Sequence, residues 1–133
     1  MRRIRLGGVA ALLLLFAGGC GEVRLQTRGK VVKGGAAFVP PAGHFVRVTF
    51  YPLENPVGDA YVAEVNQADA TFRVAGKDGR GMPAGKYRAA VELDFKRSDK
   101  LKGKFGADNS PFVFDVTAAT GELVLDLDAP PKG

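Results

Sequence analysis

Residues 87–95, with the sequence YRAAVELDF, decide the fold class of this chain. Apolar side chains occupy every second position, and most of the positions between them carry charged side chains. The alternating apolar residues are Tyr87, Ala89, Val91, Leu93 and Phe95. A period of two residues is typical of a β-strand with one buried face. We therefore expect this segment to be the central strand of a sheet.

The same alternation recurs in shorter segments on both sides of this strand, and turns rich in Gly, Pro and Asn separate them. No long stretch after residue 20 has apolar residues at helical spacing. The segments are 23–31, 46–50, 61–65, 71–74, 112–116 and 122–127. Short connections predict two hairpins, one between the third and fourth of these segments and one between the last two. Together with residues 87–95, they predict an all-β fold: a seven-stranded antiparallel sandwich of two sheets.

The beginning of the chain has the layout of a secretory signal peptide. Arg2, Arg3 and Arg5 precede the apolar run 6–17, and small residues then lead to Cys20. The uncharged stretch is shorter than the roughly 20 residues that span a bilayer. Because Cys20 is the only cysteine, it cannot form a disulfide within the chain.

Residues 17–20, AGGC, resemble the lipobox of bacterial lipoproteins, in which the cysteine carries a diacylglyceryl group and becomes the new N-terminus. The resemblance implies a lipoprotein signal peptide over residues 1–19 and lipidation of Cys20, which would anchor the protein to a membrane. Gly21 stands where an inner-membrane retention signal would have Asp, so the outer membrane is the expected location. An ordinary signal peptide with an incidental cysteine, or an uncleaved anchor, stays open.

Removal of the signal peptide changes the charge of the chain. Sixteen basic and fourteen acidic residues remain after residue 19, a net charge of +2, which gives no case for nucleic-acid binding. The remaining length suits one domain and is too short for two. We expect the β-sandwich domain to cover residues 20–128 and the end, residues 129–133, to be flexible.

Several motifs resemble those of small bacterial lipoproteins with a carboxypeptidase-regulatory-like domain. They are GKVV at 29–32, VRVTFYP at 46–52, TFRV at 71–74 and DGRGMPAGKYR at 78–88, extended by KF at 104–105 and SPFVFDV at 110–116. The chain differs from this family at Ala70, where the family usually has Gly. The resemblance implies a transthyretin-like (prealbumin-like) sandwich, generally without catalysis, and it implies no particular ligand.

Few side chains are available for catalysis. His44 is the only histidine, Ser98 and Ser110 are the only serines, and no nucleophile motif such as G-x-S-x-G is present. A metal at His44 would lack further His or Cys ligands. Several carboxylates occur without the spacing of a calcium-binding loop: Asp94, Asp99, Asp108, Asp126 and Asp128. We expect no enzymatic activity, no metal and no cofactor.

The segment 96–104, KRSDKLKGK, is the strongest local charge feature. It holds five of the sixteen basic residues that follow the signal peptide: Lys96, Arg97, Lys100, Lys102 and Lys104. We expect these side chains to contact a partner in the cell envelope, such as an anionic lipid surface or an acidic glycan, since each basic residue near an anionic membrane contributes about 1 kcal/mol. The alternative is a solvated connection whose lysines only maintain solubility.

The sequence therefore predicts a non-catalytic, lipid-anchored module with a binding or structural role toward an envelope protein or glycan. A carbohydrate-binding module of the cell surface is the alternative. Such a module needs exposed aromatic side chains, and because the chain has no Trp, Tyr51 and Tyr61 are the possible glycan contacts. An unrecognised hydrolase would need carboxylates that converge in a cleft.

Overall fold

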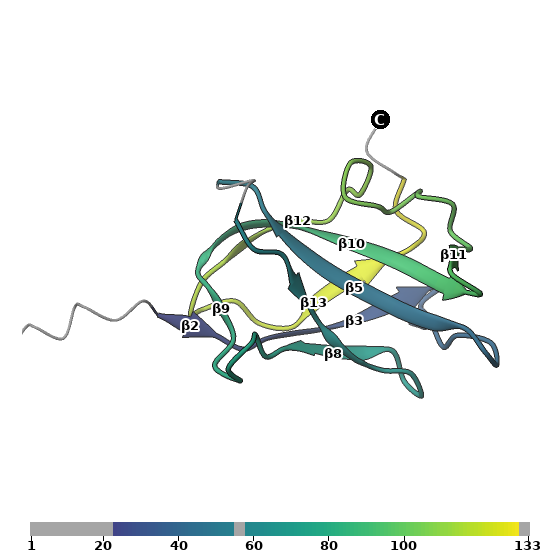
Figure 1. Ribbon diagram of the computed structural model, residues 1–133, viewed down its shortest axis with the longest axis horizontal. Helices are drawn as coiled ribbons and strands as arrows, with labels where there is room; N and C mark the ends of the chain where they lie inside the picture. The colour runs from purple at the N-terminus through teal and green to yellow at the C-terminus, as the bar shows by residue number, and fades with distance from the viewer. Residues whose placement is uncertain (1–22, 55–57, 131–133) are drawn as a thin grey trace, which may run out of the picture.

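The computed structural model describes residues 23–54 and 58–130, so Cys20 and the predicted signal peptide lie outside the described residues. The described chain is all β, with twelve strands and no helix, and hence it holds no helix that could cross a membrane. Two five-stranded sheets form its two layers (Figure 1). The predicted all-β fold is confirmed.

The first sheet is built around the strand that the sequence placed at the centre. Its strands are β5 (Phe45–Pro52), β6 (Tyr61–Val62), β10 (Gly85–Phe95), β11 (Ser98–Asp99) and β12 (Val113–Val116). Their order is β11-β10-β5-β6, and β12 also pairs with β10. β10 and β5 are antiparallel partners over eight consecutive pairs. Residues 87–95 are therefore a central strand, as predicted.

The second sheet has the order β13-β3-β8-β7, and β4 also pairs with β3. Its strands are β3 (Thr27–Lys33), β4 (Ala36–Ala37), β7 (Glu64–Asn66), β8 (Thr71–Val74) and β13 (Leu123–Asp126). β7 and β8 form the predicted antiparallel hairpin. In its turn Ala70 has a φ of 61°, so this chain keeps a left-handed conformation there without glycine.

One hydrophobic core lies between the two sheets. Phe50 of β5 is fully buried, and its ring contacts Phe72 of β8 at 5.9 Å and Tyr87 of β10 at 6.3 Å between ring centroids. The second sheet adds Val31 and Leu125, both fully buried. Among the described residues, the buried apolar side chains run from Val31 to Leu127. Residues 23–130 thus contain a complete core, and we expect them to fold without the preceding segment.

The predicted hairpin between residues 112–116 and 122–127 is wrong. β12 pairs with β10 in the first sheet, whereas β13 crosses to the second sheet and pairs with β3. The β13–β3 pairing is parallel, so the sandwich is not wholly antiparallel. Alternation identifies which side chains of a strand are buried, but it does not identify the strand with which that strand pairs. Sequence pattern alone did not choose between the two sheets.

The predicted strand at 61–65 is divided between the two sheets. β6 pairs with β5 and β7 pairs with β8, and the break falls at the buried residue Ala63, whose N–H still donates to Val48 O at 2.9 Å. The predicted first strand is also interrupted, because β2 (Arg24–Leu25) pairs with β9 (Met82–Pro83) instead of joining β3. At the other end, Ala129 packs against the core, and residues 131–133 of the predicted flexible end are not among the described residues.

Candidate functional site

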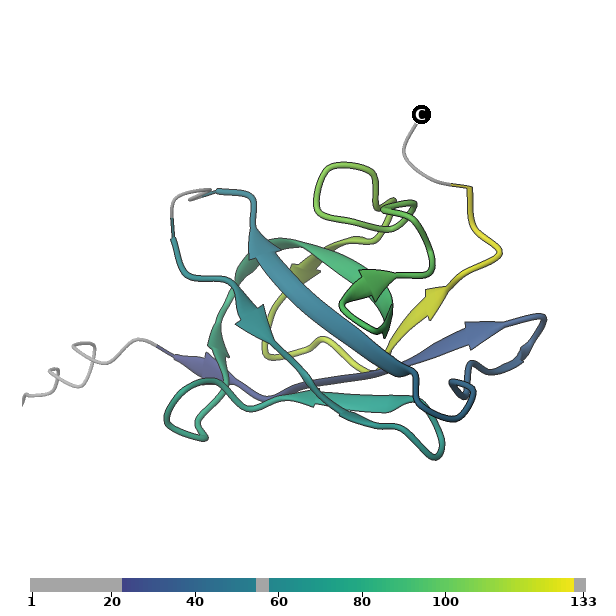
Figure 2. The ribbon, with the colours of Figure 1, turned by 45° about the vertical axis from the view of Figure 1, so that its right-hand side comes forward.

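The basic loop 96–104 starts at the end of β10. From there the chain returns along the edge of β10 that does not pair with β5. Ala89 N donates to Phe112 O and Val91 N donates to Phe105 O, both at 2.8 Å, and Leu93 N donates to Asp99 Oδ1 at 3.0 Å. Figure 2 shows this segment in green, from the short strand β11 beside the end of β10 up to the loops at the top of the view. Asp99 therefore attaches the basic loop itself to β10, and Phe105 and Phe112 attach the segment that follows the loop.

Asp99 holds the loop from within. Its Oδ1 atom accepts hydrogen bonds from Leu93 N and from Leu101 N at 2.9 Å, and its Oδ2 atom accepts one from Gly103 N at 2.9 Å. Asn109 Nδ2 donates to Gly103 O at 2.9 Å on the far side of the turn. Hydrogen bonds to a carboxylate are stronger than neutral ones. The only acidic residue of the loop is thus used to fix its backbone.

Three basic residues of this loop occupy backbone conformations that glycine or asparagine usually takes. Lys96 and Arg97, with φ of 51° and 64°, form the two-residue turn between β10 and β11, and Lys102 has a φ of 57°. Turns of this kind prefer Asn-Gly or Asp-Gly. A left-handed conformation costs a residue with a side chain roughly 1–2 kcal/mol. Lys96, Arg97 and Lys102 therefore stand at positions where the backbone conformation favours Gly or Asn.

The five basic side chains of the loop have no ion-pair partner within the part of the chain that the structure describes. Six basic residues elsewhere in that part do form ion pairs: Lys30, Lys33, Arg47, Arg73, Lys77 and Arg80. The ammonium groups of Lys96 and Lys100 lie 5.3 and 5.5 Å from the centroid of the Phe95 ring. The loop thus keeps its positive charge without a carboxylate partner, unlike these six residues.

The structure divides the five predicted contact residues into two groups. Lys96 and Arg97 lie at the tip of the hairpin, beside the outer face of the first sheet. The other three, Lys100, Lys102 and Lys104, lie at the rim of a pocket of about 350 Å³ between the loop and the second sheet. We call this the lysine-rimmed pocket; its remaining lining residues are Lys33, Phe38, Leu101, Gly103, Phe105, Asn109 and Leu127.

Lys33, the fourth lysine of this rim, comes from the end of β3 and is partly neutralised. Its Nζ atom lies 3.4 Å from Asp128 Oδ1, and Gly34 N donates to Asp128 Oδ2 at 2.6 Å. The hydrogen bond from the Gly34 N–H is the main cause that lowers the pKa of the Asp128 carboxyl from its ordinary value, and the hydrogen bond from Lys33 lowers it further. Asp128 is consequently charged at neutral pH. The uncompensated charge of the pocket comes from the loop.

Near the hairpin tip, carboxylates and a guanidinium group share the outer face of the first sheet. Asp94 Oδ2 lies 2.8 Å from Arg47 Nη2. Partial burial raises the pKa of Glu92, Asp94 and Asp99 raise it further, and Arg47 opposes them. Asp94 thus pairs with Arg47, whereas Lys96 and Arg97 have no ion-pair partner among the described residues.

The two tyrosines predicted as glycan contacts point to opposite faces of the first sheet. Tyr61 is the cross-strand partner of the buried Phe50, and its ring packs against Tyr87 at 6.2 Å between centroids. Tyr51 follows Phe50 on β5 and lies on the outer face, 38% exposed. Successive side chains of a strand alternate between faces. Tyr51 and Tyr61 therefore cannot stack on the same sugar.

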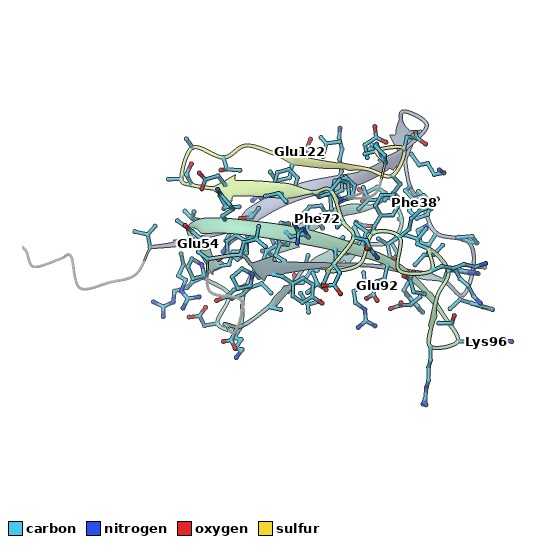
Figure 3. All side chains as sticks on the ribbon, turned by 90° about the horizontal axis from the view of Figure 1, so that it is seen from above. Phe38, Glu54, Phe72, Glu92, Lys96 and Glu122 are labelled. Carbon is cyan, nitrogen blue, oxygen red and sulfur yellow. The ribbon has the colours of Figure 1, made fainter. Side chains whose placement is uncertain are left out.

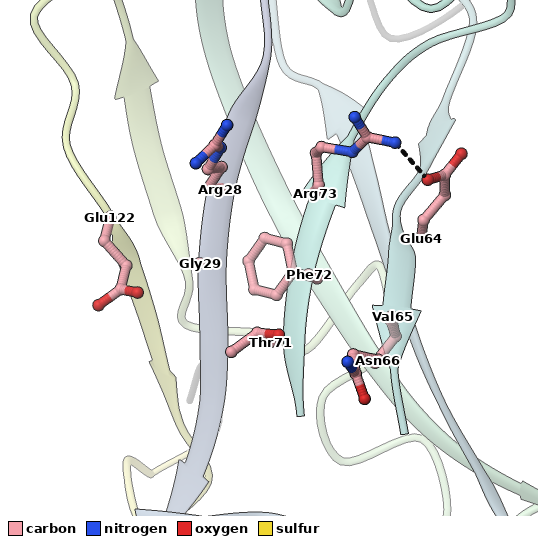
Figure 4. Close-up of a pocket in the computed structure, with 9 residues that line it drawn as sticks. All are labelled: Arg28, Gly29, Glu64, Val65, Asn66, Thr71, Phe72, Arg73 and Glu122. Atoms are coloured by element: carbon pink, nitrogen blue, oxygen red, sulfur yellow. Dashed lines mark hydrogen bonds and ion pairs between the residues drawn. The ribbon is translucent and has the colours of Figure 1, made fainter. Parts of the chain in front are cut away.

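A second depression, of about 500 Å³, lies on the outer face of the second sheet (Figure 4). Arg28 and Arg73 are direct cross-strand partners there, and Arg73 Nη2 lies 2.8 Å from Glu64 Oε1. Glu122, at the other side, pairs with Lys30 at 3.6 Å. The sequence did not indicate this depression, because it depends on the register between strands. Its positive and negative side chains nearly balance, so it offers less charge selectivity than the loop.

The residues considered for catalysis have other contacts. His44 stacks on Phe95 with ring centroids 4.2 Å apart, and its Nδ1 lies 3.1 Å from Ala42 O. Ser110 is buried and donates its hydroxyl to Ala89 O, while Ser98 is exposed in β11. Across residues 23–54 and 58–130, no three His, Cys, Asp or Glu side chains are grouped so that they could hold a metal ion. His44 and Ser110 therefore have packing roles that their contacts explain.

The N-terminal end of the described chain and the basic loop lie at opposite ends of β10. Arg24 of β2 pairs with Pro83, two residues before β10 begins, and the loop starts where β10 ends. A strand of eleven residues is about 36 Å long. Figure 1 shows β2 and β11 on opposite sides of the molecule, and Figure 3 shows Phe38 and Lys96 at the end away from Glu54.

In comparisons with known proteins, no family model matches this sequence, and neither a curated protein nor a solved structure is significantly similar to it. The resemblance to lipoproteins with a carboxypeptidase-regulatory-like domain therefore stays a prediction. Function has to be inferred from the chemistry and the position of the site.

Proposed function

We propose that this protein is a non-catalytic, lipid-anchored binding module of the bacterial cell envelope with a transthyretin-like sandwich, and that its basic loop 96–104 binds an anionic envelope component. One observation carries this proposal. The five basic side chains of a loop fixed by Asp99 lack carboxylate partners among the described residues, whereas six basic residues elsewhere have them. Unpaired charges of one sign on a fixed backbone attract ligands of the opposite sign.

The position of the loop supports a partner other than the anchoring bilayer, which we propose to be the outer membrane. The three residues from Cys20 to Val23 can reach at most about 11 Å. Lipidation of Cys20 would therefore hold the β2 end of the domain near the membrane. With β10 along the membrane normal, the orientation that we propose, the loop would lie about 36 Å further out, at the far end of β10. An acidic glycan or an acidic envelope protein can occupy that space.

Binding to an acidic polysaccharide tests the proposal. The chain from residue 21 to 133, which contains the complete core, should bind immobilised dextran sulfate and not neutral dextran. Screening shortens from about 30 Å at 0.01 M salt to about 8 Å at 0.15 M, so binding should weaken strongly over that range. Replacing Lys96, Arg97, Lys100 and Lys102 with Gln should abolish the binding and leave the melting temperature unchanged.

A matched variant separates the loop from the total charge. Replacing four ion-paired residues, Lys30, Arg73, Lys77 and Arg80, with Gln lowers the net charge by the same amount at other positions. This variant should keep most of the binding. The proposal is wrong if both variants lose binding equally, or if the loop variant binds as well as the parent at low salt.

Mass spectrometry of the mature protein tests the anchor. Protein extracted from membranes should begin at Cys20 and carry a diacylglyceryl thioether, as the sequence of residues 1–20 predicts. A Cys20→Ala variant should keep its signal peptide and run at a higher mass. A free thiol at Cys20 in membrane-extracted protein would contradict the lipoprotein assignment.

A further inference from the structure

We infer that the lysine-rimmed pocket binds a single-chain anionic amphiphile, namely a fatty-acid-like molecule with one alkyl chain and a carboxylate head. This inference rests on the proposed function, because three of the four rim lysines belong to the same basic loop. It adds a second ligand to the polyanion of that function, one that has an apolar body as well as a negative charge.

The floor of the pocket supplies the apolar requirement. Phe38 and Leu101 are partly buried and present most of its apolar surface, and the buried side chains of Phe105 and Leu127 lie beneath them. A volume of about 350 Å³ lies within the range of small-molecule sites, which are mostly apolar with a few polar groups at fixed positions. An alkyl chain gains free energy on such a floor in proportion to the apolar area that it buries.

The rim supplies the charge. Lys100, Lys102 and Lys104 alternate along the loop and have no carboxylate within 4.0 Å among the described residues, and Lys33 stands opposite them with its partner Asp128. Long lysine side chains can pack their methylene groups along an apolar wall while the ammonium group stays in water. An alkyl chain in the pocket would contact the apolar floor, and a carboxylate at the mouth would contact the rim lysines.

The pocket is built before any ligand arrives. Asp99 fixes the backbone at Leu101 and Gly103, and Asn109 fixes it again through Gly103 O. Behind the floor, Phe105 stacks on Phe112 with ring centroids 5.6 Å apart and an angle of 11°. Binding to a fixed site requires less ordering of the protein, which favours affinity.

Dependence on chain length distinguishes this ligand from a polyanion. Octanoate, decanoate and dodecanoate, each below its micelle concentration, should bind residues 21–133 with one molecule per chain in calorimetric titrations. Each pair of added methylene groups should tighten binding, by up to about tenfold where both groups are fully buried, until the pocket is full. Decanol, which has the chain without the charge, should bind at least about tenfold more weakly than decanoate.

Two variants locate the site. Leu101→Gln places an amide in the floor without changing any charge, and it should weaken decanoate binding at least tenfold while dextran sulfate binding persists. Val124→Gln makes the same kind of change at a residue of β13 that is 45% exposed and outside the pocket, and it should change neither. In the parent protein, decanoate should shift the NMR signals of Leu101 and Phe105, a readout that does not depend on the stability of a variant.

The results separate this inference from the proposed function. Dextran sulfate binding with equal affinities for octanoate, decanoate and dodecanoate would overturn the pocket ligand and leave the basic loop as a polyanion site. Chain-length-dependent decanoate binding without dextran sulfate binding would support the pocket and overturn the polyanion role. Decanoate-induced shifts confined to residues outside the pocket would also overturn the inference.

Discussion

The two edges of β10 are built in different ways. Along one edge β10 meets β5 in eight consecutive antiparallel pairs. Along the other edge the hydrogen-bond partners change every few residues. β12 pairs with the start of β10, and the backbone oxygens of Phe112 and Phe105 and the carboxylate of Asp99 then accept hydrogen bonds from it. The regular edge brings core residues of the first sheet together. The irregular edge fixes the shape of the basic loop, for which we propose a role in ligand binding.

The largest effect should follow from a change at the regular edge. Phe50→Ala removes a fully buried ring that contacts Phe72 and Tyr87, and it should lower the free energy of unfolding by about 3–5 kcal/mol. Urea denaturation measures this. Val62→Ala, at a β6 residue that is 60% exposed, should change it by no more than about 0.5 kcal/mol. A Phe50 effect as small as the Val62 effect would place the core elsewhere.

At the irregular edge, Ser110→Ala should cost less. The Ser110 hydroxyl donates to Ala89 O and accepts from Phe112 N at 3.2 Å, and the substitution leaves these buried backbone groups unpaired. Loss of about 1–3 kcal/mol in the free energy of unfolding is expected. The exposed residue Ser98 provides the control, since Ser98→Ala removes no described side-chain hydrogen bond. Equal values for the two serines would show that this edge contributes nothing to stability.

Asp99→Asn should loosen the loop more than it destabilises the fold. The amide keeps the shape of the carboxylate but removes the charge that three backbone N–H groups share. We expect a loss of about 1–2 kcal/mol and faster hydrogen exchange at the amides of Leu101 and Gly103. Asp108→Asn, at an exposed position of the same segment, should do neither. Unchanged exchange in the Asp99 variant would mean that other contacts fix the loop.

The smallest effect should come from Glu92, on the outer face of β10. Partial burial, and then Asp94 and Asp99, raise its pKa, so the folded state disfavours the charged form. The fold should therefore lose stability as the pH rises from the ordinary pKa of 4.5 through the raised one. Glu92→Gln should slightly raise the melting temperature at pH 7 and leave it unchanged at pH 3.5, where the glutamate is neutral. A lower melting temperature at pH 7 would contradict this assignment.

The parts of the fold that repeat could be predicted from the sequence. Alternation located β5, β8 and β10, and a short connection predicted the β7–β8 hairpin. It did not predict that β13 pairs with β3 or that the chain changes sheets at Ala63. Burial of a side chain is encoded locally by the period of two residues. The choice of partner strand depends on residues far away in the chain.

The candidate site shows the same limit. The composition of residues 96–104 identified the five basic side chains, but it could not assign two of them to a hairpin tip and three to a pocket. Phe38 and Leu127, which complete that pocket, lie far apart in the sequence, and only the fold brings them together. The sequence also could not show that Tyr51 and Tyr61 lie on opposite faces of the first sheet, because strand register sets their faces.

We propose that the fixed loop at the far end of β10 binds an anion away from the membrane to which a lipidated Cys20 would attach the protein. Full-length lipidated protein in phosphatidylcholine nanodiscs should bind dextran sulfate in solution at low salt. Its affinity should stay the same when phosphatidylglycerol replaces part of the lipid in the same disc, because in the proposed orientation the loop would not reach its own bilayer. Binding that falls as the anionic lipid content rises would show that the loop lies on the anchoring membrane and would contradict the claim.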